Sequence, residues 1–233
     1  MRLRLALAVA AAALIAAPAQ LPAAPAKEGA AAKDWTRTVV ATPEGGFRMG
    51  NPNAKVKVIE YGSLTCPHCA HFAVSGYGPL KTEVRSGKVS FEYRSFVLNG
   101  IDLAATLVAR CGGPSKFFPV AEKMFATQKQ WMGKISDLPQ AEKDKVMALA
   151  PEQRLGRVAE LGGLVQLAAQ HGVAPQKTKQ CLADEAEHER LQQMYEATTA
   201  QGVNGTPTFV VNGTRIHAHE WAEVEPLIRK AAG

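Results

Sequence analysis

The sequence predicts an α/β fold in which a βαβ unit and a ββα unit flank a block of helices. Two short runs rich in β-branched and aromatic residues, 55–61 and 89–97, are separated by a helix expected to begin near Cys66. The β pattern then disappears between Gly100 and Gly202, where apolar residues recur at helical spacing. Near the end of the chain, a hairpin around Asn212-Gly213 precedes a final amphipathic helix.

The first residues of the chain are expected to direct export rather than to fold. Two arginines are followed by an apolar run, Leu5 to Ala17. Its length, about 13 residues, is typical of a signal peptide and falls short of the roughly 20 residues that span a membrane. An uncleaved anchor is the alternative. The predicted segments are a signal peptide over 1–26, cleaved after Ala19 or Ala26, and an Ala/Pro/Gly-rich leader over 27–46.

The two halves of the expected sheet domain cover 47–99 and 203–233. In the first half, a crossover helix joins the two strands, so the strands should run parallel. In the second half, Asn-Gly is the favoured two-residue turn of a hairpin. The elements expected there are strands at Thr208–Val211 and Thr214–His217 and a helix from about Glu220 to Ala231.

The inserted block, 100–202, is predicted to be entirely helical. Its prolines suit helix starts or loops. The last helix is expected over Asp184–Gln201. Two earlier helices are indicated by apolar stripes, one through Ile101, Ala104, Leu107, Val108 and Cys111 and one through Leu155, Val158, Gly162, Val165 and Ala169.

Composition excludes some classes of partner. The net charge is +6 and falls to +4 once Arg2 and Arg4 leave with the signal peptide. These charges are spread out, without a block of Lys or Arg, so the sequence does not support nucleic-acid binding. About 200 mature residues suffice to bury a sizeable core.

Cys66-Pro67-His68-Cys69 is the motif that carries chemistry. It follows a β-like run and lies where a helix should begin, a context that favours a redox pair. Cys66 would lie at the positive end of the helix, where a thiolate is stabilised, and would be the nucleophile. Cys69, one turn inward, would resolve the mixed disulfide. Pro67 suits the first helical position, and His68 can add a positive charge or an N–H donor.

Metal binding is the alternative reading of this motif. Haem attachment requires a histidine directly after the second cysteine, where this chain has Ala70. A zinc or copper site could be assembled from the two cysteines with His71, His217 and His219, but nothing in the sequence brings those histidines close. We therefore expect neither a metal nor another cofactor.

Gly205-Thr206-Pro207-Thr208 precedes the strand that begins the second half. A proline at a strand entrance is tolerated at a sheet edge. Together with the upstream cysteine pair, the segment instead matches a cis-proline loop whose Thr206 backbone would face Cys66 and pair with an extended substrate.

These segments together resemble the DsbA family of thioredoxin-fold proteins. The resemblance covers about Phe47 to Ala232 and includes Met49–Ala54, the Cys-Pro-His-Cys motif and the Thr206-Pro207 loop. It implies a thioredoxin fold with a helical insertion and a bacterial periplasmic thiol–disulfide oxidoreductase. It also implies reoxidation by a DsbB-like membrane protein linked to quinones.

The resemblance assigns further roles. Glu60 matches an acidic residue that the family places beneath its active site, where it would relay protons to or from Cys69; a solvated carboxylate is the alternative. Thr206 is a departure, because family oxidases often carry an apolar residue there, whereas isomerases and reductases often carry threonine. By the same resemblance, the residues expected to bind the substrate are Thr206 and Pro207.

A second cysteine pair is expected to be structural. Cys111 lies on the apolar stripe of its helix, and Cys181 shares a side with Ala174 and Thr178. Both therefore face the helical core of an exported protein, where disulfides persist. We predict a Cys111–Cys181 disulfide; two buried thiols or a second redox pair are the alternatives.

The sequence thus predicts a monomeric enzyme that donates its Cys66–Cys69 disulfide to reduced or unfolded exported proteins. A reductase or isomerase on the same fold is the nearest alternative, followed by a periplasmic metal-binding protein. Exposed apolar surface that receives substrates is expected near Cys66, with Trp131, Phe72 and His217 as candidates.

Overall fold

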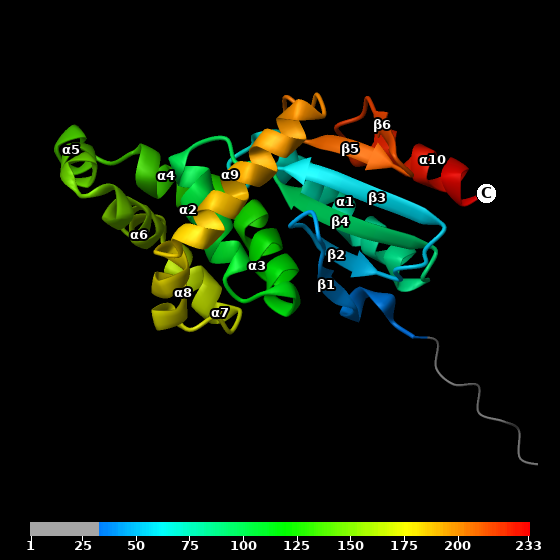
Figure 1. Ribbon diagram of the computed structural model, residues 1–233, viewed down its shortest axis with the longest axis horizontal. Coiled ribbons are helices and arrows are strands. Elements are labelled where there is room, and N and C mark those ends of the chain that lie inside the picture. The colour runs from blue at the N-terminus through cyan, green and yellow to red at the C-terminus, as the bar shows by residue number, and fades with distance from the viewer. Residues whose placement is uncertain (1–32) are drawn as a thin grey trace, which may run out of the picture. The chain divides into compact units, whose positions relative to one another are not determined.

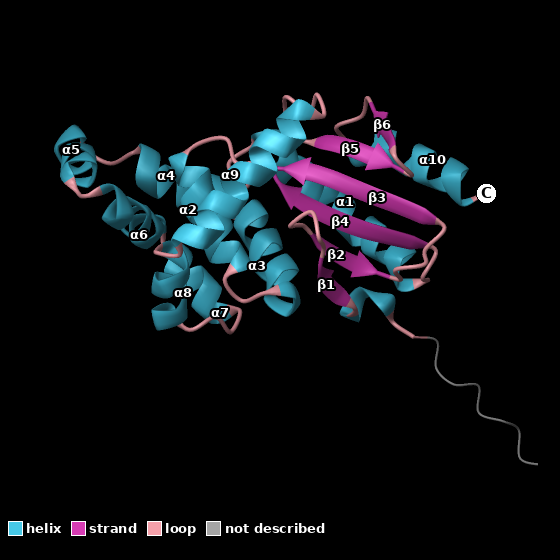
Figure 2. Ribbon diagram, viewed as in Figure 1, coloured by secondary structure: helices cyan, strands magenta, loops and turns pink. Residues whose placement is uncertain are grey.

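A six-stranded mixed sheet with helices packed on one face forms one end of the part of the chain that the computed structural model describes, residues 33–233 (Figures 1 and 2). The predicted signal peptide, 1–26, lies outside this range. The strand order is β1-β2-β4-β3-β5-β6. The strands are β1 (Val39–Ala41), β2 (Phe47–Gly50), β3 (Val56–Gly62), β4 (Val89–Ser95), β5 (Thr208–Val211) and β6 (Thr214–Ile216).

The predicted βαβ unit is present. β3 and β4 pair in parallel, from Val56 opposite Val89 to Gly62 opposite Ser95, and α1 (Pro67–Arg85) is the crossover. β5 adds antiparallel to β3 on its other side. The central strand β3 therefore ends directly before the Cys66 motif, with neighbours on both edges.

The Asn212-Gly213 turn closes the β5–β6 hairpin. Asn212 has φ 48° and Gly213 has φ 82°, the left-handed backbone that a two-residue hairpin turn requires at both positions. The Asn212 side-chain oxygen also accepts a hydrogen bond from the Lys57 backbone N–H at 2.8 Å. The same residue thus forms the turn and fixes the hairpin to β3.

The inserted block is helical, as predicted, but one predicted stripe is interrupted. Gly163 has φ 74° and ends α6, so the apolar stripe of 155–169 is divided between two helices. The inserted helices are α2 (Gly100–Arg110), α3 (Pro114–Ala126), α4 (Gln128–Ser136), α5 (Gln140–Ala148), α6 (Pro151–Gly162), α7 (Leu164–Gln170), α8 (Pro175–Leu182) and α9 (Glu185–Ala200).

The prediction that residues 27–46 form a leader outside the folded domain is wrong for the second half of that range. A short 3-10 helix covers Trp35–Arg37, and β1 then pairs antiparallel with β2. The Thr42 hydroxyl, buried, donates to Glu92 of β4 at 2.8 Å. A three-residue strand carries too little local signal to be predicted, because its stability comes from pairing with the sheet edge.

The two faces of the sheet have different covers. α1 packs on the face that carries Glu60, together with α10 (Trp221–Ala232), whose Trp221 ring lies 6.4 Å from that of Phe72. On the opposite face, α9 passes only the ends of the central strands, where its Tyr195 packs on Phe96 with ring centroids 4.8 Å apart (Figure 1). Residues 33–233 form one compact unit. Among them, no helix combines the length and apolar character needed to cross a membrane.

Candidate active site

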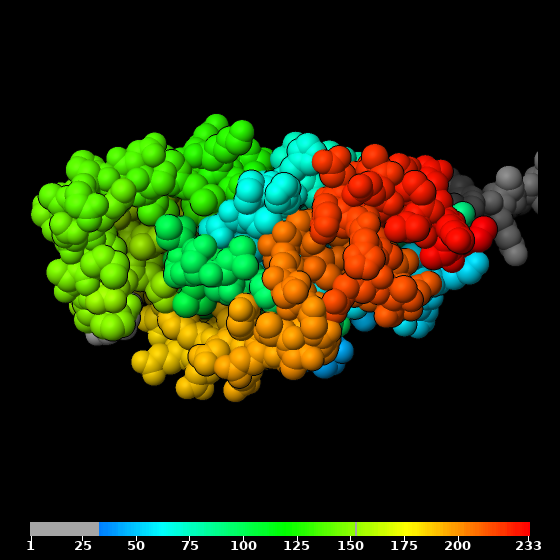
Figure 3. Space-filling model, turned by 90° about the horizontal axis from the view of Figure 1, so that it is seen from above, coloured from blue at the N-terminus to red at the C-terminus, as the bar shows by residue number. Residues whose placement is uncertain are grey.

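Cys66 and Cys69 lie at the start of α1. In Figure 3 the cyan part of the chain, which includes this start, lies between the green inserted helices and the orange and red C-terminal segment. Cys66 precedes the helix in extended conformation and is 6% exposed, whereas Cys69 is fully buried. Both are free thiols. The Cys66 Sγ lies 3.3 Å from the Thr206 carbonyl oxygen, to which it donates when the thiol is protonated, and the Thr206–Pro207 bond is cis. The structure thus brings together the two sequence segments predicted to form the site, 140 residues apart.

The surroundings of Cys66 stabilise its thiolate. Its pKa is lowered to about 5, mainly by a hydrogen bond from the Cys69 thiol. Hydrogen bonds from the Thr206 side chain and from the backbone N–H groups of Cys69 and His68 lower it further, whereas burial opposes the shift. Free N–H groups of the first turn are the positive end of the helix. His68 therefore contributes through its backbone, while its side chain is exposed.

We expect a thiolate-absorbance titration of the reduced protein to show a midpoint near pH 5. A pKa depressed below its ordinary value stabilises the reduced fold fully above that ordinary value, and the advantage is lost as pH falls through about 5. At pH 7 this contribution is on the order of 3 kcal/mol. A midpoint near 8 would contradict the described geometry.

Cys69 has the opposite environment. Burial, the hydrogen bond to Cys66 and the charge of Glu60 raise its pKa well above the ordinary value. Of the two sulfurs, only Cys66 is therefore an anion at neutral pH. Such an asymmetric pair has one good leaving group and one thiol that keeps its proton.

Glu60 lies beneath this pair and is fully buried, which excludes a solvated carboxylate. The Tyr77 hydroxyl donates to its Oε2 at 2.9 Å, and Oε1 has no hydrogen-bond partner among the described residues. Burial raises the pKa of Glu60 to about 8, with the Tyr77 hydrogen bond opposing the shift and the negative charge of Cys66 adding to it. At neutral pH the carboxyl group therefore holds a proton.

Replacement of Glu60 by glutamine is expected to remove an inflection near pH 8 from the pH profile of disulfide resolution. The raised pKa also means that stability from the protonated carboxyl, present in full below pH 4.5, is lost as pH rises through about 8. The variant should therefore gain stability relative to the wild type between pH 5 and pH 8, measured by urea unfolding. If the difference in unfolding free energy between the variant and the wild type were the same at pH 5 and at pH 8, this prediction would be wrong.

Sequence reasoning missed two tyrosines in this buried cluster. Tyr77 reaches Glu60 from α1, and Tyr93 lies opposite Glu60 in the β3–β4 register. The Tyr93 hydroxyl is buried without a hydrogen-bond partner among the described residues. It fits because Gly62 has no side chain: a Cβ there would lie 2.8 Å from that hydroxyl. The register of the parallel strands is the signal that could have identified Tyr93.

Two side chains of the inserted helices hold the loop that ends at the nucleophile. Asp102 of α2, buried, accepts from the backbone N–H groups of Leu64 and Leu98, each at 2.9 Å. Gln128 of α4, also buried, donates from Nε2 to the carbonyls of Leu64 at 2.8 Å and Cys66 at 2.9 Å. The insertion therefore helps to position Cys66.

Comparison with known proteins agrees with this geometry. Residues 42–230 match the family described as thioredoxin. The chain belongs to the thioredoxin family. It is similar to the solved protein-disulfide isomerase from Novosphingobium aromaticivorans, with 31% identity, a TM-score of 0.75 and coverage of 81% of this chain and 98% of that one.

A second solved structure places the fold among DsbA-like proteins, and a curated relative is named for disulfide chemistry. The structure of Wolbachia pipientis alpha-DsbA1 is 22% identical with a TM-score of 0.60, covering 83% of this chain and 94% of that one, which shows the fold alone. A provisionally named protein-disulfide oxidoreductase of Rickettsia bellii is 28% identical over 186 residues, 78% of this chain. The chain spans 63% of the length of that relative. The resemblance expected from the sequence is confirmed.

The loop of this thioredoxin-family site that carries Thr206 is held by His219, which sequence analysis considered only as a possible metal ligand. The His219 Nδ1 lies 3.2 Å from the Pro207 carbonyl. Because a carbonyl oxygen only accepts, His219 must donate from this nitrogen. A capping box of Glu220 and Glu223 fixes the start of α10 beside it. The last helix thereby anchors the loop that faces Cys66.

Gln128 offers a direct test of how the insertion supports the thioredoxin-family site. Gln128→Met keeps the shape of the side chain but leaves the Leu64 and Cys66 carbonyls without this donor. Unpaired buried groups should lower the free energy of unfolding by about 1–3 kcal/mol. Urea unfolding measures the loss, and Gln130→Met, on the exposed face of α4, should change it by less than about 0.5 kcal/mol.

The second cysteine pair lies within the insertion, away from the redox motif. Cys111 ends α2 and Cys181 lies in α8, and their sulfurs are bonded at 2.13 Å with Cα atoms 5.6 Å apart. The bond joins two helices across a separation of 70 residues.

The residues considered for a metal site do not assemble. The exposed His71 has its Nε2 3.9 Å from a carboxylate oxygen of Glu220, while His217 is exposed on the hairpin side and His219 holds Pro207. Across residues 33–233, no three His, Cys, Asp or Glu side chains are grouped so as to hold a metal.

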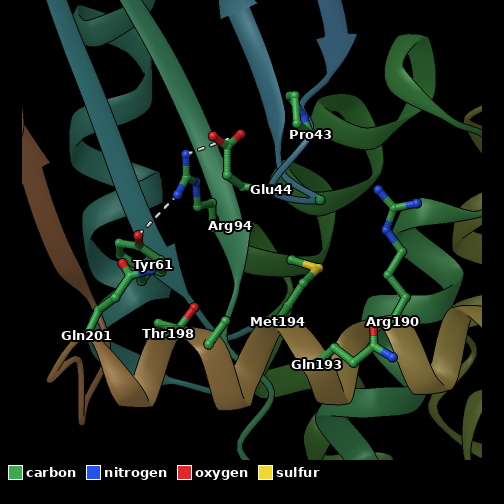
Figure 4. Close-up of a pocket in the computed structure, with 11 residues that line it drawn as sticks. Pro43, Glu44, Tyr61, Arg94, Arg190, Gln193, Met194, Thr198 and Gln201 are labelled. Carbon is green, nitrogen blue, oxygen red and sulfur yellow. Dashed lines mark hydrogen bonds and ion pairs between the residues drawn. The ribbon is translucent and has the colours of Figure 1, made fainter.

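A cavity of about 540 Å³ lies on the other face of the sheet, between the Pro43–Gly45 loop, β4 and α9 (Figure 4). Arg94 points into it but is already paired with Glu92 at 2.7 Å and Glu44 at 3.6 Å, and it donates to the Tyr61 hydroxyl at 3.2 Å. The charge of Arg94 is therefore compensated within the protein. Neither Cys66 nor Cys69 lines this cavity, so it is not part of the redox site.

The expected apolar surface at Cys66 is composed differently from the prediction. Phe72 and Trp131 are buried, and the Trp131 indole N–H donates to the Met124 carbonyl at 2.9 Å. Both were candidates for the exposed substrate-binding surface because they are large and aromatic, but both side chains are packed in the core. Of the three candidates, only His217 is exposed.

Proposed function

We propose that this chain is a dithiol oxidase, which donates a Cys66–Cys69 disulfide to reduced polypeptides. The observation that carries the proposal is the difference between the two thiols: the pKa of Cys66 is lowered to about 5, while that of buried Cys69 is raised. A stable Cys66 thiolate favours the reduced protein, so the disulfide is readily transferred. The name of the Rickettsia bellii relative as a protein-disulfide oxidoreductase supports this class of activity.

The reaction proceeds in two exchanges. A substrate thiolate attacks Sγ of Cys66, forming a mixed disulfide and breaking the Cys66–Cys69 bond. A second substrate thiolate then attacks the substrate sulfur of the mixed disulfide and releases Cys66 as its thiolate. The substrate gains one disulfide, and two electrons remain on the protein as the Cys66 thiolate and the Cys69 thiol.

Glu60 supplies the proton that the first exchange requires. Cys69 leaves as a thiolate in a buried site, where its charge is disfavoured. The protonated carboxyl of Glu60 lies beneath it and can transfer a proton, directly or through a water molecule. When the disulfide is formed again, the proton returns by the reverse path.

The reduction potential of the Cys66–Cys69 couple tests this proposal. We expect equilibration with glutathione to give a value near −120 mV, the region of strong dithiol oxidants. A value near −270 mV would instead assign the chain as a reductase. Cys111→Ala/Cys181→Ala protein should give the same potential, which ensures that the measured couple is the intended one.

A disulfide isomerase is the second candidate. Two observations favour it: threonine precedes the cis-proline, and the Novosphingobium relative is described as a protein-disulfide isomerase. An isomerase would restore activity to a test protein with mispaired disulfides without a net oxidant. An oxidase would be faster with a fully reduced test protein than with a mispaired one.

We further propose a periplasmic location and reoxidation by a DsbB-like membrane protein. The sequence of residues 1–26 supports export, and the DsbA-like fold supports the partner. Osmotic-shock fractionation of bacteria that express the full chain tests the location. Retention of the protein in the cytoplasmic fraction would contradict export. Quinone-containing membranes should reoxidise the reduced protein, which tests the proposed partner.

A further inference from the structure

A groove leads away from Cys66 along one face of α1. Its first part, a cavity of about 490 Å³, begins at Pro67 and ends at Val74 and Ala126. A second cavity, of about 610 Å³, begins at the same two residues and ends at Lys81. The two cavities share Val74 and Ala126 and therefore adjoin, and we call them together the α1–α3 groove. Its α1 wall is the helical stripe Pro67, Ala70, Val74, Gly78 and Lys81.

The groove has an apolar surface that the protein itself does not cover. Val74 is 69% exposed, more than any other large apolar side chain in the described part of the chain. Pro119 and Ala126 face it from α3 and are also exposed. Exposed apolar residues grouped beside a reactive thiol indicate contact with a ligand.

The rim of the groove is basic. Lys81 pairs with Glu122, Nζ to Oε2 at 2.6 Å, so this pair is neutral. Lys123 and Lys129 line the two cavities from α3 and α4, are exposed, and form no ion pair with a described residue. Two positive charges therefore remain for a bound ligand.

We propose that the α1–α3 groove binds the segment of the substrate polypeptide that flanks the cysteine joined to Cys66, with preference for apolar and acidic residues. This inference rests on the proposed function and names its substrate class. The stripe from Pro67 to Lys81 is about 20 Å long at 1.5 Å per helical residue. An extended segment of about six residues would fill it.

Continuity with the nucleophile favours a substrate over a second copy of this chain. The groove begins at Pro67, the residue that follows Cys66, so a chain attached to Cys66 starts beside its opening. A second copy placed there would cover Pro67 and block the attack on Cys66. The outer surface of α1 thus provides a path for the attached substrate.

Val74→Glu tests the apolar wall. The probes are two reduced peptides, each with two cysteines followed by six residues, Leu and Glu in one and Leu and Lys in the other, with reduced dithiothreitol as a small dithiol. We expect kcat/KM for the acidic peptide to fall about tenfold, while the dithiothreitol rate stays within twofold. Met147→Glu, an exposed apolar residue of α5 outside the groove, is the matched control and should change neither rate.

Lys123→Glu/Lys129→Glu tests the basic rim. Wild-type protein should oxidise the acidic peptide faster than the basic one, and the double variant should reverse this order. Equal rates for both peptides in the wild type and in every variant would overturn the groove, while the proposed function would stand. Oxidation of dithiothreitol but of neither peptide by the wild type would instead contradict the proposed function. Sedimentation showing a dimer that Val74→Glu dissociates would assign the groove to a second copy and overturn the inference.

Discussion

Cys66→Ser protein is expected to oxidise a reduced two-cysteine peptide no faster than the buffer does. A serine hydroxyl cannot form the mixed disulfide, and no other free thiol among residues 33–233 lies at the surface, because Cys69 is fully buried. The loss should therefore be complete rather than partial. Discontinuous assays with alkylation of the remaining peptide thiols measure it.

Cys69→Ser should behave differently at the same site. Cys66 can still be joined to a substrate sulfur, but the thiol that reverses the attachment is missing. The probe is therefore a disulfide-linked dimer of a one-cysteine peptide: the Cys66 thiolate should displace one peptide as a thiolate and keep the other as a mixed disulfide. We expect this mixed disulfide to accumulate, visible as a mass increase that a reductant removes. If Cys66→Ser protein accumulated a peptide adduct on Cys69 and Cys69→Ser protein accumulated none on Cys66, the assignment of nucleophile and resolving thiol would be inverted.

Loss of the Cys111–Cys181 disulfide is expected to cause the largest change in stability. The bond closes a loop with a sequence separation of 70. In the chain-entropy description such a loop contributes about 4 kcal/mol. For a domain of this size, the thermal midpoint of Cys111→Ala/Cys181→Ala protein should therefore fall by about 8–16 °C.

Calorimetry of this variant should be made with Cys66–Cys69 in a defined redox state, because the state of that pair itself changes stability. Peptide oxidation at 25 °C should persist, since the bond joins α2 to α8 and does not reach Cys66. A thermal midpoint within about 2 °C of the wild type would contradict a structural role for the bond.

Much of the architecture could be predicted because the deciding signals are local. The Asn212-Gly213 hairpin, the start of α1 at Pro67 and the Asp184 cap of α9 each follow from the conformational preferences of a few adjacent residues. β1 and the break at Gly163 were missed. A three-residue edge strand is stable only because it pairs with its neighbour in the sheet. A glycine inside an apolar stripe does not by itself show that the backbone there is left-handed.

The chain by itself determined which atoms can react: two thiols at the spacing of one helical turn, a carboxyl group six residues before them and a proline loop near the other end. The tertiary structure decided their environments. It buried Glu60 and Cys69, brought Thr206 to Cys66 and placed Gln128 of the insertion on the nucleophile loop. The physical reason is that pKa values depend on burial, charge and hydrogen bonds from residues distant in sequence, which spacing alone cannot encode.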